Sequence, residues 1–510
     1  MKLSQLIKTL SGPVEWIQGS GKDEDPEITA IHCRADAVSD GGLFVAICGF
    51  RTDGHRFVDE AIARGASAVL VSRPVCAKAA VVQVPDTRRA LSALAARFYG
   101  DPSLDLFMIG ITGTNGKTTT SFLIERILIQ AGFNTGVIGT INCRYGGKIF
   151  ENPMTTPESL DFQRILSRMR DSGVTHVVAE ISSHAIDLGR IADCWFDVGL
   201  FTNLSQDHLD YHRTMDEYWQ CKRRFFTEYL ATGPKRDRAR AVVNTDHDRG
   251  QELARELDLP VICVGRDAAC QVQAIEPGFD LSGIRTRIRT PRGTFSLHSP
   301  LVGAHNLENI LCAAGAAVAA GIENDVIRQG IEAVDCVPGR LEGVPDALGR
   351  FVYVDYAHSP DALENVINTL KPLGGARMIC LFGCGGNRDA GKRPLMGQIA
   401  ARLCDLCVIT SDNPRSESPT AIIDQILEGV RKQKDLSPYT PEMLKRGFDR
   451  RGFVVEPDRR SAIALAIGVS RPGDVVLLAG KGHETYQIIG ARTSAFDDRI
   501  EARKVLGKRE

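Results

Sequence analysis

The chain has 510 residues, with 62 Lys or Arg against 63 Asp or Glu, so its formal net charge is −1. A nearly neutral chain argues against nucleic-acid binding driven by bulk charge, and 43% hydrophobic with 25% charged residues is a globular rather than a disordered composition. This length suggests three domains of ordinary size rather than one.

The first block of the chain covers residues 1–103. Its N-terminus, MKLSQLIKTLSG, lacks the long apolar core of a signal peptide. Three short apolar runs follow, GGLFVAI, ASAVLVS and AAVVQV, which predict strands with helices between them. The block ends at YGDPS, and we expect it to form the first domain.

The second block, residues 104–336, opens with a glycine loop. LFMIGIT predicts a buried strand, and SFLIERILIQAG predicts a helix. The loop between them offers Gly113, Gly116, Lys117 and Thr118, which supply backbone N–H groups, a cation for ATP phosphates and a hydroxyl near a magnesium ion. It is not a strict Walker A motif, because Ile111 stands where that pattern requires glycine. The alternative is a glycine turn with an exposed lysine.

Two later strands of this block end in possible metal ligands. Glu180 follows the run VTHVVA, and Asp207 and His208 lie just beyond VGLFTN. A carboxylate and an imidazole at neighbouring strand ends could coordinate a divalent ion that also holds nucleotide phosphates. Taken alone, each residue is more often a capping or hydrogen-bonding group. Because they accompany the glycine loop, we favour the metal role.

The same block contains the longest apolar run, LCAAGAAVAAGI. It is too short to span a bilayer and predicts a packed helix. Fourteen cysteines are scattered along the chain without a CxxC…HxxxH array, and several, such as Cys312, Cys380 and Cys407, lie in apolar runs. Reduced, buried thiols are expected, as in a cytoplasmic protein.

The third block, residues 337–510, begins near VPGRLEG. The apolar runs RFVYVD, ARMICLF, LCVIT and DVVLLA each lead into a polar or glycine-rich loop. These loops carry Asp355, His358, Arg388, Lys392, Arg393, Arg415 and Glu484. For one isolated arginine a surface ion pair would be the simpler interpretation. Charged groups after several strands indicate a pocket for a zwitterionic or polyanionic ligand instead.

The alternation of strands and helices predicts α/β domains with mostly parallel sheets, which bind ligands at the carboxyl ends of their strands. GxSxG and HExxH are absent from the sequence. A reaction without an enzyme nucleophile therefore fits better: ATP could activate a carboxylate, and a second substrate could attack it.

Ten motifs together identify a family. In chain order they are TGTNGKTTT, TTPESLDFQ, AEISSHAI, TNLSQDHLDYH, HNLEN, PGRLE, VDYAHSPDAL, GNRDAGKRPLMG, SDNPR and GKGHE. In this order they resemble the Mur ligases, and among them the members that add the third amino acid of the peptidoglycan stem. The resemblance extends from about residue 38 to residue 500.

The resemblance implies a three-domain fold. The first domain binds the uridine nucleotide, the central one has a P-loop-type, mostly parallel sheet with flanking helices and binds ATP, and the C-terminal one is Rossmann-like and binds the incoming amino acid. The implied reaction transfers the γ-phosphate of ATP to the D-glutamate carboxylate of a UDP-N-acetylmuramoyl-dipeptide. The amine of a diamino acid then attacks the acyl phosphate. Mg²⁺ is the implied cofactor, and the enzyme is expected to be a cytoplasmic monomer without nucleic-acid or membrane partners.

The resemblance also implies roles for individual residues. The ATP phosphate loop comprises Gly113, Thr114, Asn115, Gly116, Lys117, Thr118 and Thr119, and residues around the adenosine are Asn306, Arg340, Asp355 and His358. Thr118, Glu180 and His208 match metal ligands, and Lys222 matches a carbamylated lysine. The muramoyl dipeptide is held by Thr155, Thr156, Ser182 and Arg190, and the third amino acid by Arg388, Asp412, Asn413, Pro414, Arg415, Gly480 and Glu484. Without the resemblance, Lys222 would be taken for an ordinary helix-surface lysine.

The sequence DNPR accompanies meso-diaminopimelate in this family, and different sequences there accompany L-lysine. Diaminopimelate carries a second carboxylate and amine at its distal end, so an arginine such as Arg415 can pair with that carboxylate. Lysine has no such carboxylate. Ligation of L-lysine or another diamino acid is the alternative.

One motif departs from the family pattern. Arg34, Ala35 and Asp36 stand where the family usually has Asp-Ser-Arg near the uracil. No uracil hydrogen-bond donor is therefore assigned at these positions, and Arg51 and Thr52 nearby are weak candidates for substrate contacts.

A similar glycine loop could also belong to proteins with a different function. A folylpolyglutamate-synthetase-like ligase or a different Mur ligase is one possibility, but DNPR and the block ahead of the glycine loop argue against both. A nucleotide-dependent switch or transporter ATPase is a second, and the charged C-terminal pocket argues against it. The third is a binding module for a sugar nucleotide, which would not hydrolyse ATP in response to an amino acid.

Overall fold

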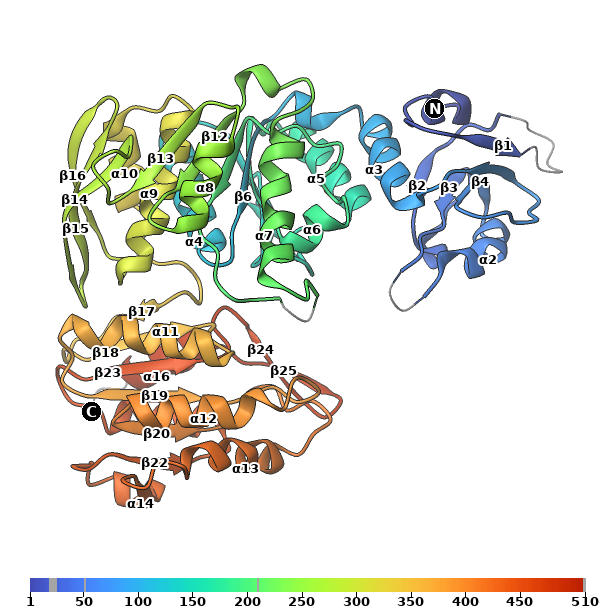
Figure 1. Ribbon diagram of the computed structural model, residues 1–510. Helices are drawn as coiled ribbons and strands as arrows, with labels where there is room; N and C mark the ends of the chain where they lie inside the picture. The colour runs from blue at the N-terminus through green and yellow to red at the C-terminus, as the bar shows by residue number, and fades with distance from the viewer. Residues whose placement is uncertain (18–24, 50–51, 209–210, 508–510) are drawn as a thin grey trace. The chain divides into compact units, whose positions relative to one another are not determined.

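The computed structural model describes residues 1–17, 25–49, 52–208 and 211–507 (Figure 1). The chain forms two compact units, each described by itself. The first unit comprises Met1–Ala274, Ile288–Phe295 and Glu308–Ile331, and the second comprises Ile275–Arg287, Ser296–Leu307 and Glu332–Glu510. The three domain boundaries expected from the sequence stay a prediction.

The N-terminal sheet has five strands. Their order is β1 (Glu15–Ile17), β5 (Ala80–Gln83), β4 (Ala66–Val71), β3 (Gly42–Val45) and β2 (Ala30–His32). β1 is antiparallel to β5, and the other pairs are parallel. The helices of this region are α1 (Leu3–Ile7), α2 (Val58–Ala63) and α3 (Thr87–Phe98). The three predicted strands are therefore confirmed as β3, β4 and β5.

The second sheet has eleven strands. Their order is β16 (Gly293–Ser299), β15 (Gly283–Thr290), β14 (Val272–Asp280), β13 (Val261–Gly265), β12 (Arg240–Asn244), β11 (Val198–Phe201), β6 (Phe107–Thr112), β10 (His176–Glu180), β7 (Thr135–Ile138), β8 (Cys143–Tyr145) and β9 (Lys148–Phe150). From β14 to β7 neighbouring strands are parallel, and β8 and β9 form an antiparallel edge. The mostly parallel central sheet is thus confirmed.

Helices follow most strands of this sheet. They are α4 (Lys117–Gln130), α5 (Ser159–Asp171), α6 (Ser183–Asp187), α7 (Met215–Arg224), α8 (Asp248–Glu256), α9 (Ala304–Ala319) and α10 (Asn324–Glu332). The long apolar run lies largely in α9, whose Ile310, Cys312 and Ala316 are fully buried, as expected for a packed helix. In the described part of the chain, no helix is long and apolar enough to cross a membrane.

The C-terminal sheet has seven strands. Their order is β17 (Glu342–Val344), β18 (Phe351–Asp355), β23 (Val475–Ala479), β19 (Met378–Phe382), β20 (Leu406–Ile409), β22 (Gly452–Val455) and β21 (Ser437–Tyr439). Only β17 is antiparallel to its neighbour. The remaining elements are α11 (Pro360–Leu370), α12 (Lys392–Leu403), α13 (Pro419–Val430), α14 (Pro441–Leu444), α15 (Arg459–Gly468), α16 (Asp498–Gly507), β24 (Tyr486–Ile489) and β25 (Arg492–Ala495).

Both faces of this sheet are covered, which explains its continuous apolar runs. Along β19, Cys380 and Phe382 pack into one core with α11, α12 and α13. The alternate residues Ile379 and Leu381 pack into a second core with α15 and α16. A parallel sheet between two helical layers is the Rossmann-like arrangement that was expected.

Candidate active site

The predicted phosphate loop joins β6 to α4. Gly113 and Gly116 have φ values of 143° and 86°, and a Cβ on Gly116 would approach Asn309 Oδ1 to 2.1 Å. Only glycine fits there without strain. Lys117 Nζ donates to the carbonyls of Gly113 and Thr114, both at 2.8 Å. The lysine therefore lies over its own loop, at the N-terminus of α4, where an anion is favoured.

A second loop, which follows β11, supports the phosphate loop. The Asn203 carbonyl accepts from the Thr114 N–H at 2.9 Å, and Asn203 Oδ1 accepts from the Asn115 N–H at 2.9 Å. Asn115 Nδ2 also donates to Ser205 Oγ at 3.0 Å. Asn203 lies in the motif TNLSQDH, but sequence reasoning did not select it. Its role depends on which backbone groups the fold places beside it.

Glu180 is the last residue of β10, and its carboxylate is 1% exposed. It accepts from Thr118 Oγ1 at 3.0 Å, from Thr140 Oγ1 at 2.8 Å and from the Thr140 N–H at 3.1 Å. No lysine, arginine or histidine in the described ranges pairs with it. Burying a carboxylate whose only hydrogen-bond donors are neutral costs free energy, and a nearby cation offsets that cost. The predicted ligands Thr118 and Glu180 are thus brought into contact.

β11, the strand that precedes His208, is not a neighbour of β10, which ends at Glu180. β6 lies between β10 and β11, so the expectation of neighbouring strand ends was wrong. The parallel βαβ connections place the first strand of this block in the middle of the sheet. His208 has a left-handed φ of 53°, and its ring centroid lies 5.9 Å from that of Tyr218.

Lys222 is buried on α7, with 1% exposure, and does not have the surface position that its sequence without the resemblance would suggest. Its Nζ donates to the Gly113 carbonyl at 2.8 Å. Burial and the nearby Lys117 ammonium hold the pKa of Lys222 well below its usual value. The sequence suggested exposure because charged residues surround Lys222, but one face of α7 packs against the phosphate loop.

Tyr218 connects these residues and was missed by sequence reasoning. Its hydroxyl lies 3.2 Å from Thr114 Oγ1, and Lys222 Nζ lies 4.5 Å from its ring centroid. Tyr218 is four residues before Lys222, so the two share a face of α7. Helical spacing was the only signal that could have found it.

The four predicted dipeptide-binding residues gather beside Glu180. Thr156 Oγ1 donates to the Glu180 carbonyl at 2.7 Å and accepts from the Ser182 N–H at 3.0 Å. Arg190 Nη1 donates to the Thr156 carbonyl at 3.0 Å. Thr155 Oγ1 lies 3.0 Å from Thr140 Oγ1.

Glu158 joins this group to the N-terminal region and was not predicted. It pairs with Arg190 at 3.0 Å and with Arg88 of α3 at 2.8 Å. Arg190 Nε is buried and has no hydrogen-bond partner among the described residues. This donor is therefore available to an acceptor outside the described residues.

In the second unit, the loops after β18 and β23 bring aromatic and cationic groups together. The Arg340 guanidinium lies 5.4 Å from the Tyr356 ring centroid, and the rings of His358 and His483 lie 4.6 and 4.9 Å from it. Burial lowers the pKa of His483 to about 4, so this ring is neutral at pH 7. Sequence reasoning did not select Tyr356 or His483.

Asp355 and Asn306 each form hydrogen bonds with backbone groups. Asp355 accepts from the Leu341 N–H at 2.7 Å and from the Ala357 N–H at 2.8 Å, and burial raises its pKa. Asn306 Nδ2 donates to the Val302 carbonyl at 2.8 Å.

The predicted amino-acid pocket lies at the carboxyl ends of β20 and β23. Asn413 Nδ2 donates to Glu484 Oε2 at 2.9 Å, and Asp412 is buried beside them. Arg415 has a left-handed φ of 53°, fixed by bonds from its N–H to the Ile488 carbonyl at 3.1 Å and from the Gly490 N–H to its own carbonyl at 2.6 Å. Its Nη1 donates to the Gly386 carbonyl at 2.9 Å.

The remaining predicted residues of this pocket flank it. Arg388 is exposed on the loop after β19. The Pro414 carbonyl lies where a Cβ on Gly386 would come to 1.9 Å, so only glycine allows this approach. Gly480 has a φ of 111° next to Asp412.

The uridine candidates receive little support from their surroundings. Arg34 Nε donates to Asp36 Oδ1 at 3.0 Å in an exposed pair, and Ala35 is buried. Thr52 is exposed, and its carbonyl accepts from the Gly49 N–H at 2.9 Å. Arg51 lies outside the described residues.

Cys48, Asp53 and His55 form a cluster of potential metal ligands in the N-terminal region. His55 Nε2 accepts from the Ser72 N–H at 2.9 Å, so Nδ1 carries the hydrogen and donates to Asp53 Oδ1 at 2.7 Å. A metal bound to Nδ1 would need the tautomer with its hydrogen on Nε2, and that hydrogen would point at the Ser72 N–H. We therefore interpret this cluster as a structural clamp. Cys312, Cys380 and Cys407 are buried free thiols, as expected.

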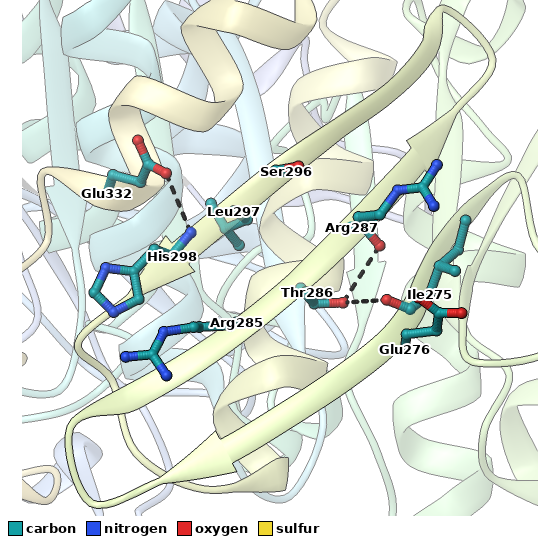
Figure 2. Close-up of a pocket in the computed structure, with 9 residues that line it drawn as sticks. All are labelled: Ile275, Glu276, Arg285, Thr286, Arg287, Ser296, Leu297, His298 and Glu332. Carbon is teal, nitrogen blue, oxygen red and sulfur yellow. Dashed lines mark hydrogen bonds between the residues drawn. The ribbon is translucent and has the colours of Figure 1, made fainter.

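An open hollow of about 410 Å³ lies in the second unit, and Figure 2 shows the residues that line it. Arg285, Arg287 and His298 line it together with Glu276 and Glu332. Arg285 already pairs with Asp280 at 3.1 Å. None of the lining residues is a predicted site residue, and their charges are mixed, so we assign no function to this hollow.

Three protein-family models match consecutive parts of the chain. Residues 27–99 match the model described as "Mur ligase family, catalytic domain", residues 111–317 the "Mur ligase middle domain", and residues 339–482 the "Mur ligase, glutamate ligase domain". The chain is 49% identical over 477 residues to the UDP-N-acetylmuramoyl-L-alanyl-D-glutamate--2,6-diaminopimelate ligase of Geobacter metallireducens, covering 93% of each chain.

Solved structures agree with these matches. A structure of a UDP-N-acetylmuramoyl-L-alanyl-D-glutamate--2,6-diaminopimelate ligase is 30% identical, with a TM-score of 0.68, covering 94% of this chain and 95% of that one. The MurF ligase from Thermotoga maritima in complex with ADP is 18% identical, with a TM-score of 0.61, covering 94% and 96%. At that identity the second likeness shows the fold alone.

Proposed function

The chain belongs to the Mur ligase family, and from this premise we propose that it joins meso-2,6-diaminopimelate to the D-glutamate of UDP-N-acetylmuramoyl-L-alanyl-D-glutamate. As a Mur ligase it is an ATP-dependent amide-forming enzyme of peptidoglycan synthesis. The observation that carries the choice of substrates is the 49% identity to a ligase of that name over 93% of both chains. Ligation of L-lysine is the remaining alternative for the amino acid.

The reaction needs an activated carboxylate. The γ-phosphate of ATP passes to the D-glutamate carboxylate, ADP leaves, and the amine of diaminopimelate then attacks the acyl phosphate and releases phosphate. Lys117 and the N–H groups at the start of α4 hold the phosphates. Positioning and charge neutralisation supply most of the rate in such transfers.

The buried carboxylate of Glu180, without a cationic partner in the described ranges, fits a magnesium ion, together with the Thr118 hydroxyl. His208 is the third candidate ligand. A bound Mg²⁺ would neutralise phosphate charge.

Lys222 is the candidate for carbamylation. A neutral amine forms an N–C bond to carbon dioxide and releases a proton, which leaves a carbamate anion, and the lowered pKa of Lys222 favours the neutral amine. Arg190 and its unsatisfied Nε are suited to the dipeptide, whose carboxylates can accept from them. A cytoplasmic location and a monomeric state stay predictions.

Phosphate release measured with ATP, the UDP-muramoyl-dipeptide and a panel of diamino acids tests this function. We expect release to depend on meso-diaminopimelate and to be low with L-lysine, which leaves Arg415 unpaired. Equal use of the two amino acids would contradict the assignment of DNPR to diaminopimelate, although not the assignment as a ligase. Release without any amino acid would favour a non-ligase ATPase.

We expect Arg415→Ala to lower kcat/KM for diaminopimelate by roughly ten- to a thousandfold. A hydrogen bond to a charged group contributes about 1.5–3 kcal/mol, and losing a bidentate pair also leaves the distal carboxylate desolvated. The KM values for ATP and for the nucleotide substrate are expected to change little. Arg446→Ala, which removes an exposed arginine of the same unit, is the matched control. A variant with the parental constant for diaminopimelate would show that Arg415 does not bind it.

A further inference from the structure

Lys481 lies in the turn after β23, between two glycines with left-handed backbones. Gly480 has a φ of 111° and Gly482 a φ of 51°. A Cβ on Gly480 would come within 2.9 Å of Asp412 Oδ2, so the glycine lets the turn approach the DNPR loop closely. The Lys481 side chain is 0% exposed. Sequence reasoning selected both Gly480 and Glu484 from this motif and passed over the lysine.

The Lys481 ammonium touches three residues predicted to bind the amino acid. Its Nζ lies 3.2 Å from Glu484 Oε2, 3.2 Å from Asn413 Oδ1 and 3.6 Å from Asp412 Oδ1. A fully buried ammonium is stable only when it is paired and hydrogen-bonded. Lys481 therefore holds two carboxylates in one place, and these contacts fix its own position in turn.

The contacts leave one carboxylate oxygen for a ligand. Glu484 Oε2 accepts from Asn413 Nδ2 at 2.9 Å as well as from Lys481. Glu484 Oε1 accepts no hydrogen bond from residues that the structure describes, and the side chain is 17% exposed. Asp412 and Glu484 together carry one negative charge more than Lys481 balances. The Glu484 end of the pocket is thus suited to an additional ammonium group.

We propose that Lys481 is a positioning residue of the amino-acid pocket. By holding Glu484 Oε2 and balancing Asp412, it directs Glu484 Oε1 toward the distal ammonium of the incoming diamino dicarboxylic acid. This inference rests on the proposed function. Because Lys481 acts through Glu484, it governs recognition of the distal amine, whereas Arg415 governs recognition of the distal carboxylate.

The test compares two amino acids that differ only at the distal amine. They are meso-diaminopimelate and 2-aminopimelate, which keeps the distal carboxylate and lacks the distal amine. The parent is expected to prefer diaminopimelate, and Lys481→Met, of similar length without the charge, is expected to reduce that preference by about tenfold or more, mainly through KM for diaminopimelate. The KM for ATP is expected to stay at the parental value. Lys504→Met, which removes an exposed lysine paired with Glu501, is the control.

The possible outcomes distinguish a failure of the inference about Lys481 from a failure of the proposed function. A folded Lys481→Met that lowers the use of both amino acids equally, or leaves the preference unchanged, overturns the inference, as does equal use of both by an active parent. If circular dichroism shows that Lys481→Met is unfolded, the double variant Lys481→Met/Asp412→Asn, which removes the uncompensated second carboxylate, is measured in the same way. The parental preference in that variant overturns the inference. A parent that uses neither amino acid refutes the proposed function instead.

Discussion

Lys117→Ala is expected to slow phosphate release by about a thousandfold or more while the protein stays folded. Lys117 is the cation at the N-terminus of α4, and its Nζ already lies over the loop carbonyls of Gly113 and Thr114. Alanine removes the charge that the β- and γ-phosphates need. The Gly113 carbonyl keeps its hydrogen bond from Lys222 Nζ in this variant, so the loss of stability is expected to be small.

The measurement is phosphate release at saturating substrates, with circular dichroism to verify the fold. Lys78→Ala, at an exposed lysine of the N-terminal region, is the matched control and is expected to behave like the parent. Parental turnover by Lys117→Ala would show that the glycine loop does not take part in catalysis.

Lys222→Ala is the second change expected to abolish turnover. Lys222 is buried against the phosphate loop, and its Nζ reaches the same Gly113 carbonyl as Lys117. If the working form is a carbamate, alanine removes an anion that bicarbonate cannot restore. A small carboxylic acid such as acetate is expected to recover part of the activity by occupying the space of the carbamate.

The control for this variant is Gln220→Ala, an exposed position on the same helix. Phosphate release is measured for both variants with and without added acetate. A crystal structure with ATP and magnesium bound that shows a bare Lys222 amine at full occupancy would count against the modification. Full activity of Lys222→Ala would exclude any catalytic role for the residue.

The parallel strands could be predicted because both of their faces are covered. Runs such as those of β6, β19 and β23 are apolar at nearly every position and end in polar loops, and parallel strands place these loops at one edge. β15 was not predicted, although its sequence IRTRIRT alternates arginines with buried Ile and Thr residues, which is the period of a half-buried strand. Only two of these buried residues are apolar, so the segment contains no continuous apolar run.

Site residues could be predicted where glycines or strand ends mark them in the sequence. They could not be predicted where tertiary packing determines whether a side chain is buried and what it contacts. Glu180 was found from its position at the end of a strand. The burial of Lys222 among the charged residues of α7, and that of Lys481 between two glycines, depends on loops distant in the sequence. Asn203 supports the phosphate loop through its backbone carbonyl and its side chain. No sequence pattern predicts such a contact.

ATP is expected to activate the D-glutamate carboxylate as an acyl phosphate before the amide forms. The most direct test uses UDP-muramoyl-dipeptide labelled with ¹⁸O in that carboxylate, together with ATP and meso-diaminopimelate. One ¹⁸O atom is expected in each phosphate released, because the bridging oxygen of the acyl phosphate leaves with phosphorus when the amine attacks. Phosphate without the label, released while ATP is consumed, would mean that water rather than the carboxylate takes the phosphoryl group, and would contradict an acyl phosphate intermediate.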